Sequence, residues 1–176
     1  MLAAELFIMA LLALISVQDL KTRLVFWFCF PLLAVAFCVI HWFRAGSITQ
    51  LWRPVAFNLA IVVVMLLAVT IYVWITRKKL INIADTMLGW ADILFLLSVA
   101  CYFSVPNFLI FNIVSMSCAL IAWIIWQALA ERKTKRIPLV GFQAITLTLF
   151  LSADWWLHLV NLTDDAWLFN LVSKWN

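Results

Sequence analysis

The sequence predicts an all-α membrane protein with about six transmembrane helices and a C-terminal interfacial helix. Of its 176 residues, 68% are apolar and 11% are charged, whereas soluble domains average about 45–50% apolar and about 25% charged residues. Uncharged stretches long enough to cross a hydrocarbon core of about 30 Å recur along the chain, and short charged pieces separate them. This apolar excess is too large for one small soluble fold, so a soluble globular domain is excluded.

Six apolar stretches are the expected spans, since about 20 helical residues cross a bilayer. The second, third and fifth stretches contain no charged residue, whereas the first contains Glu5 and the fourth contains Asp92. The first lacks a preceding basic region and a small-residue cleavage site, so we expect it to be retained rather than removed as a signal peptide. The stretches are Leu2–Gln18, Leu24–Phe43, Val55–Thr76, Thr86–Ser104, Pro106–Ala130 and Ile137–Ala153.

Residues 1–153 are therefore the predicted six-span transmembrane domain, and the remaining residues have a different composition. Residues 154–176 mix several tryptophans with aspartates and a histidine. Tryptophan is enriched at membrane–water interfaces. We expect this segment to be an amphipathic, Trp-rich helix in the outer interface rather than a seventh span.

The basic residues predict an orientation in the membrane. Alternate loops on one side carry nine of the twelve, and the positive-inside rule assigns these loops to the cytoplasm. Both termini are then outside a multi-pass inner (cytoplasmic) membrane protein, with lipids as its partners. Topology explains the net charge of +4, so no nucleic-acid partner is expected. The nine residues are Lys21, Arg23, Arg77, Lys78, Lys79, Arg132, Lys133, Lys135 and Arg136, and the other side has Arg44, Arg53 and Lys174.

Several familiar catalytic motifs are absent from the sequence. The four cysteines lie inside expected spans without a C-x-x-C pair, and we interpret them as packing residues. There is no H-E-x-x-H and no G-x-S-x-G, and the three glycines are too scattered for a phosphate-binding loop. We therefore expect no metal and no cofactor.

Two acidic residues lie at the depth of the spans, where an ionisable group costs roughly 2.5–3.5 kcal/mol. Asp19 ends the first span, and Asp92 lies about six residues into the fourth, about 9 Å deep. Asp19 can alternatively be a membrane-edge residue paired with Lys21 or Arg23, and Asp92 a structural hydrogen-bonding group. Asp85 is expected to be a helix N-cap.

Two carboxyl groups in a low-dielectric site share a proton, so one can activate water while the other polarises a peptide carbonyl. This is the chemistry of aspartic proteases, and it needs no metal or nucleophilic side chain. Gly89, three residues before Asp92, lies on nearly the same helical face and permits close approach of a backbone. Helix–helix packing through this small residue is the alternative.

Three local motifs resemble those of the prepilin peptidases, the type IV leader peptidases among the GxGD-type intramembrane aspartyl proteases. Asp19 to Val25 is similar to the family's D-x-x-x-R-x-I/V run. Gly89 to Asp92 is similar to G-x-G-D, with Ala91 in place of the second glycine. Ile137 to Phe142 is similar to the I-P element that opens the last span. Phe26 replaces a usual proline, and Leu94 and Phe95 stand where the family often has a lysine.

The resemblance implies a membrane aspartyl endopeptidase that removes short basic leaders from pilin-like precursors at the cytoplasmic face, in type IV pilus assembly or protein secretion. It implies catalytic roles for Asp19 and Asp92. We expect Gly89, Ala91, Pro138 and Gly141 to bind substrate or shape the site.

The resemblance is to a short form of the family, because the N-terminal cysteine-motif domain of longer members is missing, and we expect no methyltransferase activity. The alternative is a non-catalytic membrane subunit or receptor that keeps the fold. A transporter with Asp92 as proton relay is disfavoured, because no acid or histidine continues the path across the membrane.

Overall fold

The computed structural model describes residues 1–45, 48–77, 89–129 and 138–173, and within these ranges every regular element is a helix. This confirms the all-α class. Each of the six predicted apolar stretches overlaps one described helix, and one more helix follows near the C-terminus. The helices are α1 (Leu2–Thr22), α2 (Cys29–Ala45), α3 (Ile48–Arg77), α5 (Trp90–Val99), α6 (Val105–Leu129), α7 (Leu139–Trp155) and α8 (Ala166–Ser173).

Three of these helices have the length and apolar character needed to cross a membrane. They comprise Leu2–Thr22, Trp52–Thr76 and Val105–Ala128. The helices α2, α5 and α7 are shorter, with 17, 10 and 17 residues. A ten-residue helix rises about 15 Å, which is half of a hydrocarbon core of about 30 Å. The described helices therefore support a membrane protein with three candidate spans, and the count of six stays a prediction.

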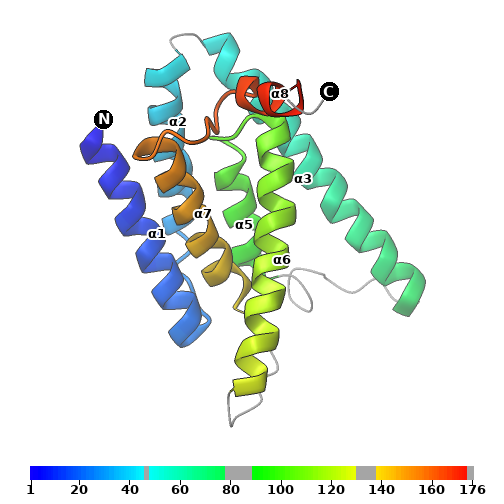
Figure 1. Ribbon diagram of the computed structural model, residues 1–176. Coiled ribbons are helices and arrows are strands. Elements are labelled where there is room, and N and C mark those ends of the chain that lie inside the picture. Colours follow the sequence, from blue (N-terminus) through cyan, green and yellow to red (C-terminus); the bar gives the residue numbers. More distant parts are fainter. Residues whose placement is uncertain (46–47, 78–88, 130–137, 174–176) are drawn as a thin grey trace.

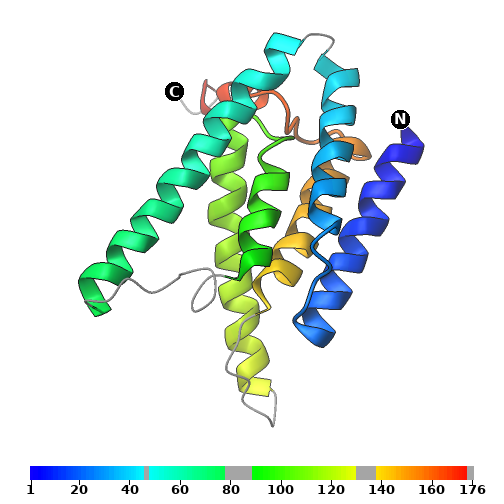
Figure 2. The ribbon, with the colours of Figure 1, turned by 180° about the vertical axis from the view of Figure 1, so that it is seen from behind.

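Helix α7 occupies the middle of the bundle and packs against α1 on one side and α6 on the other. Helices α2 and α5 pack against each other behind α7, as the reverse view shows (Figures 1 and 2). The core between these helices is rich in aromatic side chains. Fully buried aromatic residues are Phe30, Phe37, Phe95, Tyr102, Phe103, Phe108 and Phe111.

Helix α3 diverges from the bundle along its length (Figures 1 and 2). Its first half is attached through Asn58, whose buried Nδ2 donates hydrogen bonds to the carbonyl oxygens of Ala100 and Phe103. Val62, one turn later, is also buried. Beyond it the helix exposes large apolar side chains, including Leu67 and Ile71. These side chains suit contact with lipid.

Helices α1, α5 and α7 begin or end at the same end of the bundle, hereafter the aspartate end. Helix α1 ends after Thr22 because Arg23 adopts a left-handed conformation, with φ 56°, and donates its N–H to the Asp19 carbonyl oxygen. Helix α5 begins at Trp90, since Gly89 is extended with ψ 145°. The expectation that Asp92 lies about six residues inside its helix is therefore wrong. Asp92 is the third helical residue and lies in the first turn.

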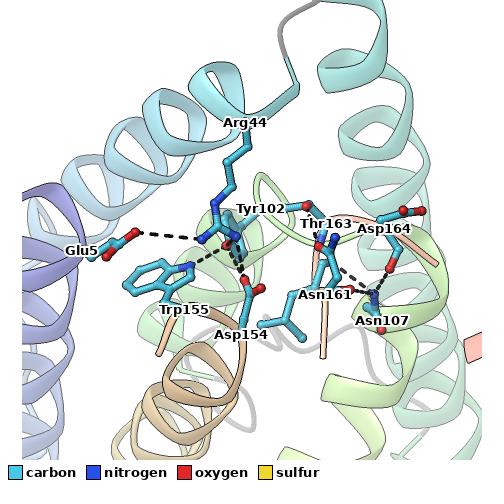
Figure 3. A network of polar contacts seen from close by, with 10 residues as sticks. Glu5, Arg44, Tyr102, Asn107, Asp154, Trp155, Asn161, Thr163 and Asp164 are labelled. Carbon is cyan, nitrogen blue, oxygen red and sulfur yellow. Dashed lines mark hydrogen bonds and ion pairs between the residues drawn. The ribbon is translucent and has the colours of Figure 1, made fainter. Parts of the chain in front are cut away.

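The opposite end, hereafter the network end, is joined by polar side chains (Figure 3). The Asp154 carboxylate accepts hydrogen bonds from the Arg44 guanidinium at 2.9 Å and the Tyr102 hydroxyl at 2.7 Å. The Trp155 indole N–H donates to the Tyr102 oxygen at 2.6 Å, and a second Arg44 nitrogen is 3.9 Å from Glu5. These contacts connect the ends of α1, α2 and α7 with the turn between α5 and α6.

Helix α7 extends two residues beyond the predicted end of the last span. Trp155 is only 4% exposed, because its indole N–H donates to the Tyr102 oxygen inside the bundle. Trp156 is half-exposed. Residues 161–165 are joined to the start of α6 through Asn107, whose Nδ2 donates to the carbonyl oxygens of Asn161, Leu162 and Asp164 (Figure 3).

Candidate aspartate site

Asp19 caps a helix other than its own. Its side chain is 7% exposed in the last turn of α1, and Oδ2 accepts a hydrogen bond of 2.6 Å from the backbone N–H of Gly141. Gly141 is the third residue of α7, where N–H groups have no partner within the helix. A helix N-terminus carries a partial positive charge. The contact therefore stabilises an ionised Asp19 and joins α1 to α7.

Pro138 explains why α7 needs this external partner. It is the buried N-cap of α7 and has no side-chain oxygen to accept from the first N–H groups. Asp19 takes over that function from a neighbouring helix. Pro138 thus starts α7 at the position where Gly141 meets the carboxylate.

Gly141 allows the two helices to approach closely. A Cβ atom at this position would lie 3.2 Å from Asp19 Oδ2 and 3.2 Å from Leu20 Cγ. Both distances are shorter than ordinary van der Waals contacts. A larger residue here therefore requires the Asp19 and Leu20 side chains, or α1 itself, to move by a few tenths of an ångström.

Asp92 holds the beginning of α5 in place. Its Oδ2 accepts the Gly89 N–H at 2.9 Å, and its own N–H donates to the Gly89 carbonyl oxygen at 3.0 Å. The carboxylate thus satisfies the backbone donor at the N-cap position, as an acid at this position does in a capping box. The side chain is partly exposed. Asp92 therefore makes a structural hydrogen bond, as the alternative interpretation expected, and its side chain is also partly accessible from outside the bundle.

Ala91 occupies the position where G-x-G-D has its second glycine. It is partly buried and packs against the hydrophobic core. The methyl group therefore fits in this helix without a change of backbone conformation.

The structure brings the separate motifs together. The carboxylates of Asp19 and Asp92 are near enough to interact electrostatically, although the two residues are 73 positions apart in the chain. Gly141, from the third motif, binds Asp19, and Gly89, from the second, binds Asp92. Asp19 also interacts with the charge of Arg23. No ion pair within 4 Å joins Asp19 to a base in the described ranges.

Not every residue considered in the sequence can be placed. Asp85 lies outside the described residues, as do the basic residues Lys78, Lys79, Arg132, Lys133, Lys135, Arg136 and Lys174. Within the described ranges, no group of three or more His, Cys, Asp or Glu side chains is arranged to hold a metal ion. At the aspartate end, the described residues supply two carboxyl groups and the backbone N–H groups that donate hydrogen bonds to them.

Two sets of polar residues were not expected from the sequence. Arg44 and Tyr102 meet Asp154 at the network end, and Gln143 is completely buried in α7. A search for acids inside spans overlooks neutral amides. A search for any hydrogen-bonding side chain in an apolar stretch finds Gln143, because burying such a group without a partner is costly.

No family model, curated protein or solved structure matches this chain.

Proposed function

We propose that the protein is a membrane aspartyl endopeptidase that cleaves pilin-like precursors, with Asp19 and Asp92 as its acid–base pair. The single observation that carries the proposal is the meeting of three motifs at the aspartate end. There the Asp19 carboxylate accepts the Gly141 N–H and interacts electrostatically with Asp92. These are the motifs in which the sequence resembles the prepilin peptidases.

The two carboxyl groups divide the work of hydrolysis. Asp19 is the base, because the hydrogen bond from the start of α7 favours its ionised form. It takes a proton from a water molecule, whose oxygen attacks the scissile carbonyl carbon. Asp92 is the acid and gives its proton to the carbonyl oxygen. When the diol collapses, Asp19 passes its proton to the leaving amine and Asp92 regains a proton from the diol hydroxyl.

The proposed substrate is a precursor with a short basic leader followed by an apolar helix. The leader stays in the cytoplasm, the apolar helix lies in the membrane, and the scissile bond meets the aspartate end. The proposal includes six crossings of the inner membrane with the aspartate end on the cytoplasmic side. The apolar helices and the basic residues Lys21 and Arg23 beside Asp19 support this placement.

Removal of either carboxylate tests the proposal. The full chain is expressed in membranes with a pilin-like precursor, and leader removal is followed by the mobility of the product. We expect Asp19→Asn and Asp92→Asn each to lower the cleavage rate at least about 100-fold, the usual contribution of a general acid or base. Asp85→Asn is the control and retains activity. Wild-type cleavage by either of the two variants rejects the assignment.

A second candidate function, a non-catalytic membrane subunit or receptor, is favoured by one observation. The hydrogen bond from Gly89 to Asp92 gives this carboxylate a reason to be present without any chemistry. Purified protein mixed with a fluorescent leader peptide separates the two functions. Binding with no cleavage across a panel of precursors supports the receptor, and release of the leader supports the peptidase.

A further inference from the structure

Gln143 is a buried amide without a partner. Its side chain is 0% exposed, and neither Oε1 nor Nε2 has a hydrogen bond within the described part of the chain. A buried amide left unpaired costs its full desolvation free energy, whereas an apolar side chain of the same shape avoids that cost. By contrast, the neighbouring polar side chain in α7, Thr146, has a hydrogen-bond partner, because its hydroxyl donates to the Phe142 carbonyl oxygen.

The position of Gln143 on α7 follows from two contacts. Gly141 faces α1, because its N–H meets Asp19. Phe150 faces α6, because its ring meets Phe111 with centroids 5.8 Å apart. Gln143 precedes Phe150 by seven residues, or two turns, so it lies on the same stripe and also faces α6.

Gln143 is also close to the aspartates in depth. It lies two residues beyond Gly141, a rise of about 3 Å along α7. Side chains in a helix lean toward its N-terminus, which for α7 is the aspartate end. The carboxamide is therefore directed to the depth at which Gly141 meets Asp19.

The facing stripe of α6 carries small side chains. One and two turns after Phe111, it contains Ser115 and Ala119, which are small and fully buried. The Ser115 hydroxyl donates to the Asn112 carbonyl oxygen of its own helix. Helices α6 and α7 thus meet across small side chains beside an amide that has one acceptor and two donors available.

We propose that Gln143 binds the backbone of the substrate strand a few residues from the scissile bond, on the face of α7 opposite Asp19, accepting a peptide N–H through Oε1 and donating Nε2–H to a peptide carbonyl. A peptide group is the complement of a carboxamide, since it supplies one donor and one acceptor. The inference rests on the proposed function and names a substrate-binding residue for the same site. Because the amide is enclosed between α6 and α7, the two helices separate when the strand enters.

The test compares Gln143→Leu with the full-length wild-type chain, both in detergent micelles. The first probe is a synthetic precursor peptide with a basic leader and an apolar helix. The second is a series of variants of this peptide, in each of which one backbone N–H near the scissile bond is replaced by an ester oxygen. Peptide Kd is measured by fluorescence in an Asp92→Asn background, so that binding is read without cleavage. KM, kcat and thermal unfolding are measured with Asp92 intact. Thr146→Val is the matched control.

We expect Gln143→Leu to raise Kd and KM at least tenfold, with kcat changed less than threefold and Tm of the free protein unchanged or higher. One ester peptide should bind wild type and Gln143→Leu equally, because the lost N–H is the one that Gln143 accepts. Thr146→Val should bind the amide peptide like wild type.

Unchanged Kd and KM in Gln143→Leu overturn the inference. A lower Tm with unchanged Kd overturns it too, and assigns the amide to an internal water. Failure of the proposed function gives a different result from failure of this inference. If wild type binds the peptide without cleaving it and Gln143→Leu still weakens binding, Gln143 binds the strand but the protein is not a peptidase. If wild type neither binds nor cleaves the peptide, both are rejected.

Discussion

At the scale of single residues, the contact between Asp19 and Gly141 both stabilises the packing of α1 against α7 and positions the proposed base. The same hydrogen bond satisfies an N–H at the start of α7 and holds the carboxylate within electrostatic range of Asp92. Glycine is favoured here because a Cβ at this position would press on the Asp19 and Leu20 side chains. Changes at Gly141 should therefore affect both stability and cleavage.

We predict that Gly141→Ala lowers cleavage at least tenfold and the free energy of unfolding by about 1–3 kcal/mol, the usual cost of overpacking. The added Cβ pushes against the Asp19 carboxylate and the Leu20 side chain together, so these side chains, or α1 itself, must shift. Leader cleavage and thermal unfolding in detergent measure the two effects. Wild-type behaviour in both would contradict the close approach of α1 and α7.

Gly89→Ala is the matched comparison and should be milder. A Cβ at Gly89 lies 3.3 Å from Asp92 Oδ2, the mobile end of a side chain, and its backbone φ of −67° suits any residue. We expect a loss of up to about 1 kcal/mol, because alanine is a poorer N-cap than glycine. Cleavage should fall less than in Gly141→Ala. A larger loss at Gly89 would show that α5 tolerates less displacement than its contacts indicate.

At the scale of helices, the two ends of the bundle are held by different interactions. Backbone N–H groups and carboxylates meet at the aspartate end, whereas an arginine, a tyrosine and an aspartate meet at the network end. The contacts at the network end hold α2 and α7 together far from the proposed chemistry. They can therefore be removed without touching the candidate site.

Asp154→Leu should destabilise the protein by about 3 kcal/mol, because it leaves the Arg44 guanidinium and the Tyr102 hydroxyl without their shared acceptor. This is the lower part of the range for a broken buried pair, since the Arg44 side chain is 24% exposed. Glu5→Gln is the control. It removes only the longer 3.9 Å pair, and we expect a change of about 0–1 kcal/mol. Equal destabilisation of Asp154→Leu and Glu5→Gln in thermal unfolding would contradict the assignment of the larger contribution to Asp154.

Asn58→Leu tests the attachment of α3. The substitution leaves the carbonyl oxygens of Ala100 and Phe103 unpaired, at a cost of about 1–3 kcal/mol each. Thr70→Val removes a hydroxyl that bonds only to the Leu66 carbonyl oxygen of its own helix, and should have little effect. The thermal unfolding midpoints of Asn58→Leu and Thr70→Val are compared. Similar midpoints would mean that α3 is held by other contacts.

At the scale of the whole molecule, the proposed orientation can be tested with single cysteines. We expect an impermeant thiol reagent, added to intact cells, to label Arg53→Cys at the start of α3. It should label Lys21→Cys and Thr76→Cys only after the membrane is opened, because both lie at the aspartate end. All three positions are exposed, and the naturally exposed Cys118 is first replaced by Ser. The reverse pattern would place the aspartate end outside.

Some of this arrangement was predictable from the sequence, and particular residues show why the rest was not. Asp19 and Asp92 are conspicuous because few charges lie in the apolar stretches. The position of Asp92 in its helix was mispredicted, because hydropathy does not register that Gly89 is extended and that the helix begins only at Trp90. The burial of Trp155 was not predictable for a similar reason, since composition does not reveal a buried hydroxyl that binds the indole.

The sequence by itself determined the class of this protein: apolar stretches of helical length require an all-α membrane protein, because unpaired backbone groups are too costly in hydrocarbon. Only the tertiary structure decided which helices meet. The approach of α7 to α1 depends on a glycine facing a carboxylate 122 positions earlier in the chain. Such a contact between distant residues follows from how side chains fit when helices pack, and local composition carries no record of it.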